Sequence, residues 1–329
     1  MPPYGEETSL KIRQFDFNVL SSMFGLYLIL GKRDTGKTTW CRYMNTFIPS
    51  SMNGIVIVVT QNEKLKLDWA QYVPILYIFY PDDCDILDQV RNITNNIMFA
   101  AERNNLGDSV WADNTITIIL DDVGTENIMK FKSLRDLAAT GRHCYVNVFI
   151  LAQYFIQVPT QVRTQFDYIF MMQTFSDRNI KMLHKEYISM IDMTTFKALI
   201  STATSNYGTL VLKTGARTAH VEDVCFFARI PPSEVGAKVR FGKKEQWEFS
   251  DRYYFEHSNR VDLCHAKNPW STQQADVQFD EDDDDGYDDC GGVHRNRKDK
   301  PMPLEIHTVQ SGKRKITIKM LPSANQTQS

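Results

Sequence analysis

The sequence predicts an α/β fold in which a central, mostly parallel β-sheet is flanked by helices. Short apolar runs recur along the chain, and each is nearly continuous rather than alternating with polar residues. Such runs are typical of strands that are buried on both faces. Segments with apolar residues at helical spacing separate the runs. Strands that alternate with helices in this way form parallel sheets covered by helices.

Apolar runs predict the strands of this sheet. Two later runs, residues 208–212 and 224–228, predict a further pair of strands that can form a hairpin at one sheet edge. The earlier runs are residues 25–30, 55–59, 75–80, 116–120, 145–151 and 166–172. The run at 55–59 is rich in β-branched residues, which favour strands.

Helical spacing appears in the intervals between the runs. Residues 87–102 and 128–139 carry apolar side chains at steps of three or four positions, which predicts helices. Residues 177–199 form a third helical region, with a break expected near Asp192. The alternation of strands and helices therefore continues through most of the chain.

The charge of the chain is distributed unevenly. Its formal net charge is −3, but residues 276–289 hold nine acidic and no basic residues. Residues 290–329 hold eight Lys or Arg and two acidic residues, and the rest of the chain is neutral. The total excludes a protein that is basic throughout, as many nucleic-acid binders are. The basic residues at 295–300 and 313–315 can still bind a polyanion such as DNA, and the acidic residues at 280–289 can compete for them within the chain.

The composition changes near residue 258. Of 329 residues, 43% are hydrophobic, which is enough for a large core, but apolar residues become scarce after this point. We predict one folded domain over residues 1–257 and a disordered tail over residues 258–329. Residues 315–320 are strand-like and form the one exception within this tail.

The cysteines and the N-terminus indicate the compartment. The six cysteines are scattered, which excludes clustered zinc spacings and fits a reducing environment. The first residues lack the basic and apolar regions of a signal peptide. The apolar runs are far shorter than the ~18–20 residues that cross a bilayer. We therefore expect a soluble protein without a membrane span.

Residues 31–38 carry the clearest motif. They read GKRDTGKT and match G-x-x-x-x-G-K-[ST], with a predicted strand before them and a predicted helix after them. Glycines allow backbone N–H groups to point at phosphate oxygens, and Lys37 and Thr38 supply a charge to the phosphates and a hydroxyl to Mg²⁺. The alternative is an ordinary glycine turn. The predicted phosphate-binding residues are Gly31, Lys32, Arg33, Asp34, Thr35, Gly36, Lys37, Thr38 and Thr39.

Two acids follow the apolar run at 116–120. An acid at the carboxyl end of a strand is the arrangement that holds Mg²⁺ beside a phosphate loop, and Asp121 fits this role. Asp122 can orient or deprotonate the attacking water, and Glu126 is a rival base. The alternative is that either acid caps the next helix or turn. No guanine-reading N-K-x-D motif is present, which favours ATP over GTP.

Polar residues also bracket the run at 145–151. Gln153 follows its carboxyl end, where ligands bind in open α/β sheets, and can contact the γ-phosphate or the water. A buried amide with satisfied hydrogen bonds is the alternative. Arg142 precedes the run and therefore lies at the opposite edge, from which it could act as an arginine finger on a neighbouring subunit. A surface ion pair is the alternative for Arg142.

Taken together, these residues resemble a known family. The order of phosphate loop, paired acids, arginine and glutamine is similar to that of the HerA/FtsK superfamily of P-loop motor ATPases. Within it, the chain resembles the poxvirus-type genome-packaging ATPases of nucleocytoplasmic large DNA viruses, over roughly residues 22–255. The shared segments are residues 31–33, 120–122, 141–143, 151–153, 158–170 and 241–249.

The resemblance implies a RecA-like P-loop NTPase fold and an ATP-hydrolysing motor. It implies that such a motor, a homo-oligomeric ring, moves double-stranded viral DNA into the capsid during virion assembly. ATP and Mg²⁺ are the implied ligands, and capsid or virion-assembly proteins are the implied partners. The implied location is the viral assembly site in the host cytoplasm, with association with the virion as an alternative.

Other functions are compatible with the same motifs. One is a HerA/FtsK-like DNA translocase with another role, and another is a nucleotide-gated assembly scaffold with little turnover. Contacts between a packaging motor and DNA should be directed at phosphates. The candidate contacts, for which a solvated helix face is an equal explanation, are Lys64, Lys66, Lys130, Lys132 and Arg135.

Overall fold

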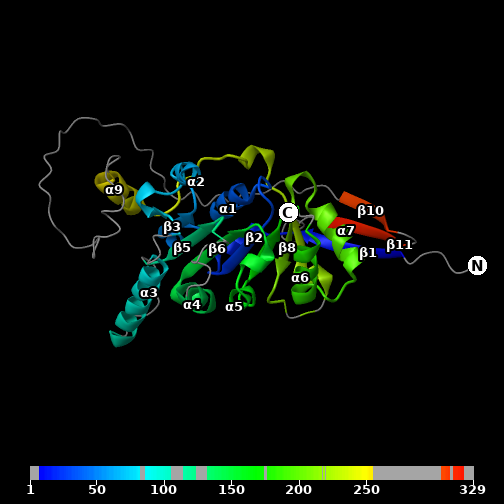
Figure 1. Ribbon diagram of the computed structural model, residues 1–329, viewed down its shortest axis with the longest axis horizontal. Helices are drawn as coiled ribbons and strands as arrows, with labels where there is room; N and C mark the ends of the chain where they lie inside the picture. Colours follow the sequence, from blue (N-terminus) through cyan, green and yellow to red (C-terminus); the bar gives the residue numbers. More distant parts are fainter. Residues whose placement is uncertain are drawn as a thin grey trace, which may run out of the picture.

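The computed structural model describes residues 7–81, 86–104, 114–123, 132–173, 176–216, 218, 220–254, 305–311 and 314–321. These residues form an 11-stranded sheet that runs the length of the molecule, with helices on both faces (Figure 1). The strand order is β10-β11-β1-β9-β8-β7-β2-β6-β5-β3-β4.

The strands and helices occupy the following residues. The strands are β1 (Glu7–Gln14), β2 (Leu26–Leu30), β3 (Ile55–Thr60), β4 (Ile78–Phe79), β5 (Ile116–Asp121), β6 (Val146–Ala152), β7 (Tyr168–Met171), β8 (Thr209–Lys213), β9 (Cys225–Ala228), β10 (Glu305–Ser311) and β11 (Arg314–Leu321). The helices are α1 (Lys37–Asn45), α2 (Glu63–Trp69), α3 (Ile86–Arg103), α4 (Lys132–Thr140), α5 (Thr160–Arg163), α6 (Asp177–Tyr187), α7 (Met193–Ala203), α8 (Val221–Val224) and α9 (Lys244–Tyr253).

The predicted fold class is confirmed. Strands β4, β3, β5, β6, β2 and β7 pair in parallel, and β8 pairs antiparallel with both β7 and β9. The β8–β9 hairpin does not end the sheet, because β1, β11 and β10 continue it. The run at 75–80 gives only the two-residue strand β4, because a 3-10 turn occupies residues 75–77.

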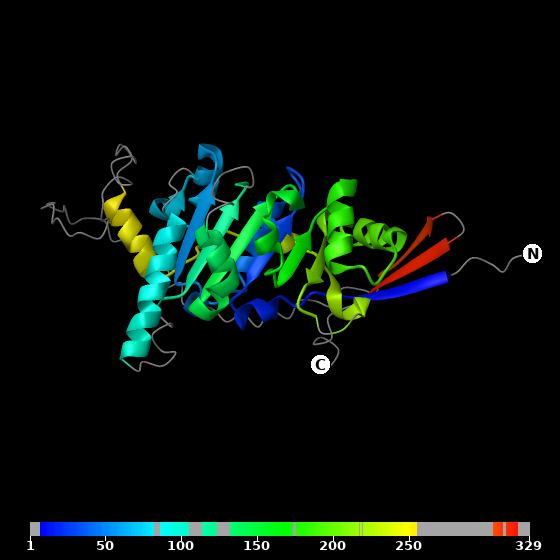
Figure 2. The same ribbon diagram turned by 60° about the horizontal axis from the view of Figure 1, so that its bottom comes forward.

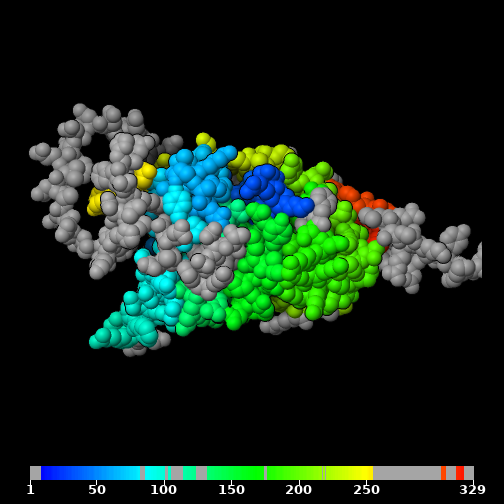
Figure 3. All heavy atoms as spheres, viewed as in Figure 1, coloured from blue at the N-terminus to red at the C-terminus, as the bar shows by residue number. Residues whose placement is uncertain are grey.

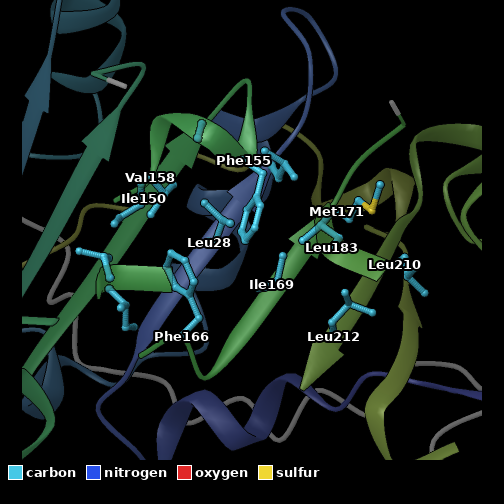
Figure 4. Packing of buried hydrophobic residues seen from close by; sticks show 14 of the residues in the cluster. Leu28, Ile150, Phe155, Val158, Phe166, Ile169, Met171, Leu183, Leu210 and Leu212 are labelled. Carbon is cyan, nitrogen blue, oxygen red and sulfur yellow. The ribbon is translucent and has the colours of Figure 1, made fainter. Parts of the chain in front are cut away.

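The central strands are buried on both faces, as their continuous apolarity predicts. In β2, Leu26, Leu28 and Leu30 join one buried cluster, whereas Tyr27 and Ile29 join a second cluster on the other face. Figure 4 shows part of the first cluster, in which Leu28 lies among side chains from neighbouring strands and from the segments that cover that face. Two separate cores therefore enclose one sheet.

Two helices replace the third predicted helical region. Helix α6 ends at Tyr187, and α7 begins after Asp192. The Asp192 carboxylate accepts hydrogen bonds from the backbone N–H groups of Thr194 (2.9 Å) and Thr195 (3.1 Å), which is the usual cap for a helix N-terminus. The predicted break is confirmed. Helices α3 and α4 match the other two regions, except that residues 124–131 lie outside the described part of the chain.

Helix α9 closes the sheet beside β3. The Gln246 side chain donates to the Val56 carbonyl (2.7 Å) and accepts from the Val56 N–H (3.1 Å), so that it replaces a strand partner. Gly242 makes this approach possible. Its φ is +89°, and a Cβ there would lie 2.0 Å from Gln246 Oε1. The segment that resembles the packaging ATPases at 241–249 therefore anchors α9 to the sheet.

Part of the predicted disordered tail is ordered. The strand expected at residues 315–320 is present within β11, whereas β10 lies where the sequence predicts disorder, and there the prediction is wrong. Strand β11 pairs in parallel with β1, from Glu7↔Lys315 to Arg13↔Leu321, and β10 pairs with β11. Ile316, Ile318 and Met320 are buried. A strand with this alternating apolar pattern is stable only when it pairs with β1, and composition alone does not reveal that pairing. Residues 255–304, including the acidic run, lie outside the described residues.

The ends of the sheet are built from distant parts of the chain. Figure 2 shows β1, β10 and β11 together at one end, while α3 and α9 lie at the other. β1 was missed by sequence reasoning because it alternates apolar and polar residues over a short span. None of the helices in the described residues is long and apolar enough to cross a membrane.

Candidate active site

The sheet topology brings the predicted nucleotide residues to one edge. Strand β6 pairs with β2 on one side and with β5 on the other, all in parallel. Leu30 is opposite Ala152, and Asp121 is opposite Leu151. The loop at 31–36, Gln153 and the two acids therefore follow adjacent strands at their carboxyl ends. The blue segment that contains the loop lies at the surface of the face seen in Figure 3.

The loop at 31–36 is compact and held by its own contacts. A Cβ on Gly31 would lie 2.5 Å from Thr35 Oγ1 and 2.7 Å from Met172 Cβ, so only glycine fits there. Gly36 has a φ of +86°, which glycine adopts without strain. Thr35 Oγ1 donates to the Lys32 carbonyl oxygen (2.8 Å). The loop then leads directly into α1, whose first residue is Lys37.

Lys37 directly follows the loop as the first residue of α1. Its side chain is 8% exposed, and Nζ donates to the Lys32 carbonyl oxygen (2.8 Å). Burial lowers the pKa of Lys37, and the nearby charges of Asp121 and Asp122 act in the opposite direction. A buried ammonium that depends on two carboxylates gains from an additional anionic partner, such as a phosphate.

Asp121 is the most enclosed acid of the site. Its Oδ2 accepts hydrogen bonds from Thr38 Oγ1 (3.0 Å) and from the Trp69 indole N–H (2.9 Å). Burial raises the pKa of the Asp121 carboxyl, while these two hydrogen bonds and Lys37 lower it. A buried carboxylate of this kind is stabilised by a cation beside it.

The oxygens of Asp121 and Thr38 fit Mg²⁺. This ion takes oxygen ligands, and it is usually held by one or two carboxylates together with substrate phosphates. Within the described residues, no group of three or more His, Cys, Asp or Glu side chains could hold a metal by itself. Mg²⁺ held by Asp121 and Thr38 would therefore need further oxygen ligands, such as those of nucleotide phosphates.

Trp69 supports Asp121 and was missed by sequence reasoning. It ends α2 and is fully buried. The Arg42 guanidinium lies 4.6 Å from its ring centroid and 4.1 Å from that of Tyr72, and it also pairs with Asp68 (2.7 Å). Helix α2 is thereby connected to the acid at the end of β5. No local pattern marks Trp69, because 52 residues separate it from Asp121.

Asp122 and Gln153 are in direct contact. Gln153 Nε2 donates to Asp122 Oδ1 (2.7 Å), and Asp122 has a φ of +58°, in the left-handed region. The Gln153 main chain is held as well, since its N–H donates to Gln157 (3.2 Å) and its carbonyl accepts from Asn179 (3.4 Å). Glu126, the rival base, lies outside the described residues.

Arg142 lies at the opposite edge of the sheet. It sits in the turn before β6 and forms an ion pair with Asp167, which precedes β7. Asp167 also accepts from the Leu26 N–H (2.9 Å) at the start of β2. The Arg142 side chain is 55% exposed and helps line a cavity of about 210 Å³. A surface ion pair, the alternative considered for Arg142, is thus present within one subunit.

The candidate DNA contacts differ in exposure. Lys64 and Lys132 are exposed, whereas Lys66 is 6% exposed and lies 5.1 Å from the Tyr80 ring centroid. Arg135 donates to Gln161 Oε1 (2.8 Å). Lys130 is outside the described residues. Burial makes Lys66 a poor contact for DNA, and a structural role explains it better.

Comparison with known proteins identifies the family. Residues 12–226 match the family described as Poxvirus A32 protein, which is well over half of the chain. The chain belongs to the poxvirus A32 family. This confirms the resemblance to poxvirus-type genome-packaging ATPases and, with it, the assignment as a P-loop ATPase with a role in genome packaging.

Individual relatives of this A32-family chain are distant. A protein of Invertebrate iridescent virus 6 is 24% identical over 247 residues, covering 74% of this chain and 91% of that protein. A protein of Acanthamoeba polyphaga mimivirus is 21% identical over 247 residues, covering 74% and 84%.

Solved structures with a similar arrangement are more distant still. The DNA-packaging ATPase of Sulfolobus Turreted Icosahedral Virus aligns with a TM-score of 0.43 and 13% identity, covering 63% of this chain and 98% of that one. EssC (ATPases 2 and 3) of Geobacillus thermodenitrificans aligns with a TM-score of 0.47 and 10% identity, covering 70% and 44%. These values add no argument about function.

Proposed function

We propose that this A32-family chain hydrolyses ATP at the carboxyl edge of its sheet and uses the energy to move double-stranded viral DNA into the capsid. The observation that carries the proposal is the contact between Asp122 and Gln153 (2.7 Å), next to a phosphate loop that is already folded. Nucleotide binding alone requires no acid and amide on adjacent strands at this edge. Hydrolysis does, because an attacking water must be held and polarised.

Each residue of the site has a separate role in ATP binding or hydrolysis. The N–H groups of the loop and of the first turn of α1 face the phosphates. Lys37 exchanges its contact with the Lys32 carbonyl for phosphate oxygens, which its burial favours. Asp122 orients or deprotonates the water. Gln153 donates a hydrogen bond to the Asp122 carboxylate and so fixes its position relative to the water.

Asp121 and Thr38 would hold Mg²⁺. Asp121 Oδ2 and Thr38 Oγ1 already lie 3.0 Å apart, joined by a hydrogen bond. When bound, Mg²⁺ neutralises the charge that develops on the β- and γ-phosphate oxygens. Trp69 donates to the same Asp121 oxygen as Thr38 and so also holds the carboxylate in place. The carboxylate is therefore positioned before any ligand arrives.

Arg142 would act on the site of a neighbouring subunit. It lies at the edge of the sheet opposite to the phosphate loop. In its ion pair with Asp167 the arginine side chain is 55% exposed, and the more buried Asp167 carboxylate keeps a second donor in the Leu26 N–H. Arg142 can therefore leave Asp167 when a neighbour's nucleotide approaches. This supports a homo-oligomeric ring in which each active site is completed by the next subunit.

The remaining partners follow from the packaging role. The exposed Lys64 and Lys132 are the described candidates for contacts with DNA phosphates. Capsid or virion-assembly proteins would bind the motor at the viral assembly site in the host cytoplasm. A packaging motor must move any sequence, so the DNA contacts should show little base preference.

The test measures ATP hydrolysis with and without double-stranded DNA, together with the mass of the assembly. We expect wild-type turnover to rise with DNA and with assembly. Lys37→Ala should lose both ATP binding and hydrolysis, because the phosphates lose their buried cation. Lys185→Ala, a change of an exposed lysine on α6, is the control and should leave both unchanged.

Two results would contradict the proposal. Hydrolysis by Lys37→Ala at the wild-type rate would remove the phosphate loop from the reaction. Nucleotide binding by the wild type without turnover, even with DNA, would instead support a nucleotide-gated scaffold.

A further inference from the structure

The turn between α7 and β8 lies beside the phosphate loop. Residues 205–207 form this turn, and β8 begins at Thr209. Leu210 pairs with Met171, which on its other side pairs with Leu30, the last residue before the loop. The start of β8 is therefore at the same sheet edge as the loop, two strands away.

Trp40 connects this turn to the loop directly. Its indole N–H donates to the Tyr207 carbonyl oxygen (3.3 Å), and its own backbone N–H donates to the Gly36 carbonyl (2.8 Å). The indole is buried, and a Cβ on Gly36 would lie 4.0 Å from its Cδ1 atom. One indole ring thus separates Gly36 of the loop from the main chain of Tyr207.

The turn has an unusual backbone that is fixed by its surroundings. Asn206 and Tyr207 have φ angles of +52° and +59°, a region that residues other than glycine rarely adopt. A Cβ on Gly208 would lie 2.3 Å from the Ala203 carbonyl oxygen, so the chain can pass α7 only with glycine there. Strained backbone of this kind persists where the structure has a use for it.

Tyr207 is the most exposed of the large hydrophobic residues that the structure describes. It is 81% exposed. Tyrosine usually buries its ring, since the apolar surface is large. Among the described residues, none stacks on this ring or accepts a hydrogen bond from its hydroxyl. A rigid main chain therefore presents an unused aromatic face to solvent.

We infer that Tyr207 is the platform on which the base of the bound nucleotide stacks while the loop at 31–38 holds its phosphates. The inference rests on the proposed ATP site and adds the part that recognises the base. Aromatic rings stack on any nucleobase, because every base has a π-face. Tyr207 thus adds affinity for nucleotides over bare phosphates, with little discrimination between adenine and guanine.

The test compares two probes that differ only in the nucleoside. We measure by calorimetry the Kd of AMPPNP, a non-hydrolysable ATP analogue, and that of inorganic tripolyphosphate. Loss of one stacked base should raise the AMPPNP Kd of Tyr207→Ala by roughly 5- to 150-fold. Its tripolyphosphate Kd should match that of the wild type, because Trp40 holds the main-chain carbonyl of residue 207 and not its ring.

Two further variants sharpen the comparison. Tyr207→Phe keeps the ring and should bind AMPPNP within about 3-fold of the wild type, since stacking needs only the π-face. Tyr253→Ala, which removes an exposed tyrosine from α9, is the matched control and should change neither Kd.

The possible failures are distinguishable. Equal weakening of both probes by Tyr207→Ala would mean that the turn only supports the loop, and an unchanged AMPPNP Kd would mean that the base lies elsewhere. Either result overturns the inference and leaves the ATP site intact. A wild type that binds neither probe would overturn the proposed function itself.

Discussion

At the scale of single residues, the site is defined by hydrogen bonds that converge on Asp121. One carboxylate oxygen accepts from Thr38, in the first turn of α1 directly after the phosphate loop, and from Trp69, which belongs to α2. Hydrogen bonds from two helices therefore fix the position of the Asp121 carboxylate. Partners that orient a metal-binding side chain contribute to metal affinity even though they do not touch the metal.

We expect Trp69→Phe to weaken Mg²⁺ binding by roughly 10- to 100-fold, because the ring stays while the N–H that orients Asp121 is lost. Titration of Mg²⁺ into the AMPPNP-bound protein measures the change. Trp247→Phe is the matched control, since it also removes an indole N–H, but one that donates to the Phe241 carbonyl beside α9. Equal Mg²⁺ affinity in wild type and Trp69→Phe would show that Thr38 alone positions the acid.

Local motifs predict only some of these residues. Lys37, Thr38 and Asp121 are recognisable because a strand, a glycine loop and an acid occur in a fixed order. Trp69 is not, since it reaches the site through packing of α2 against the sheet. The same holds for Asp167, which pairs with Arg142 across 25 residues. Such partners are set by tertiary structure and leave no periodic signal in the chain.

At the scale of elements, strands that are buried on both faces can be recognised from the sequence, whereas other strands are harder to recognise. Strands of the central sheet are continuous apolar runs and are predicted correctly. Strands β1 and β11 alternate apolar and polar residues, and β10 contains only two apolar residues, Ile306 and Val309. β1 and β11 stabilise each other although more than 300 residues lie between Glu7 and Lys315. Helix α9 depends in a similar way on the contact of Gln246 with Val56.

We expect Gly242→Ala to destabilise the protein by about 2–4 kcal/mol, since a methyl group would combine left-handed backbone strain with displacement of Gln246. Thermal unfolding measures the loss. Gly236→Ala is the matched control, because Gly236 also has a positive φ (+78°) but has open space around its Cβ position. If both variants lose equal stability, backbone strain alone explains the effect and the Gln246 contact contributes nothing.

At the scale of the whole molecule, the phosphate loop and Arg142 occupy opposite edges of one sheet. We expect Arg142→Ala to reduce turnover by about 10³- to 10⁵-fold while ATP binding persists, if it completes a neighbour's site. Arg252→Ala, at an exposed position on α9, should leave turnover unchanged. Steady-state hydrolysis and AMPPNP binding, measured on the same samples, separate the two effects.

Mixing variants tests the shared site directly. Subunits with Arg142→Ala retain an intact loop, and subunits with Lys37→Ala retain the arginine. A mixed assembly should recover part of the activity that neither variant has alone. Mixtures without activity, in assemblies shown by mass to contain both variants, would place Arg142 outside the reaction.

This separation of loop and arginine gives each subunit a polarity. If Arg142 acts on a neighbour's site, the surface that supplies it must meet a different surface that receives it, and the contact would be head to tail rather than two-fold symmetric. Contacts of this type close into a circle only if each step turns by a whole fraction of a revolution, and otherwise they grow into filaments. In the proposed ring, the angle between the two edges of the sheet in neighbouring subunits would therefore fix the number of subunits.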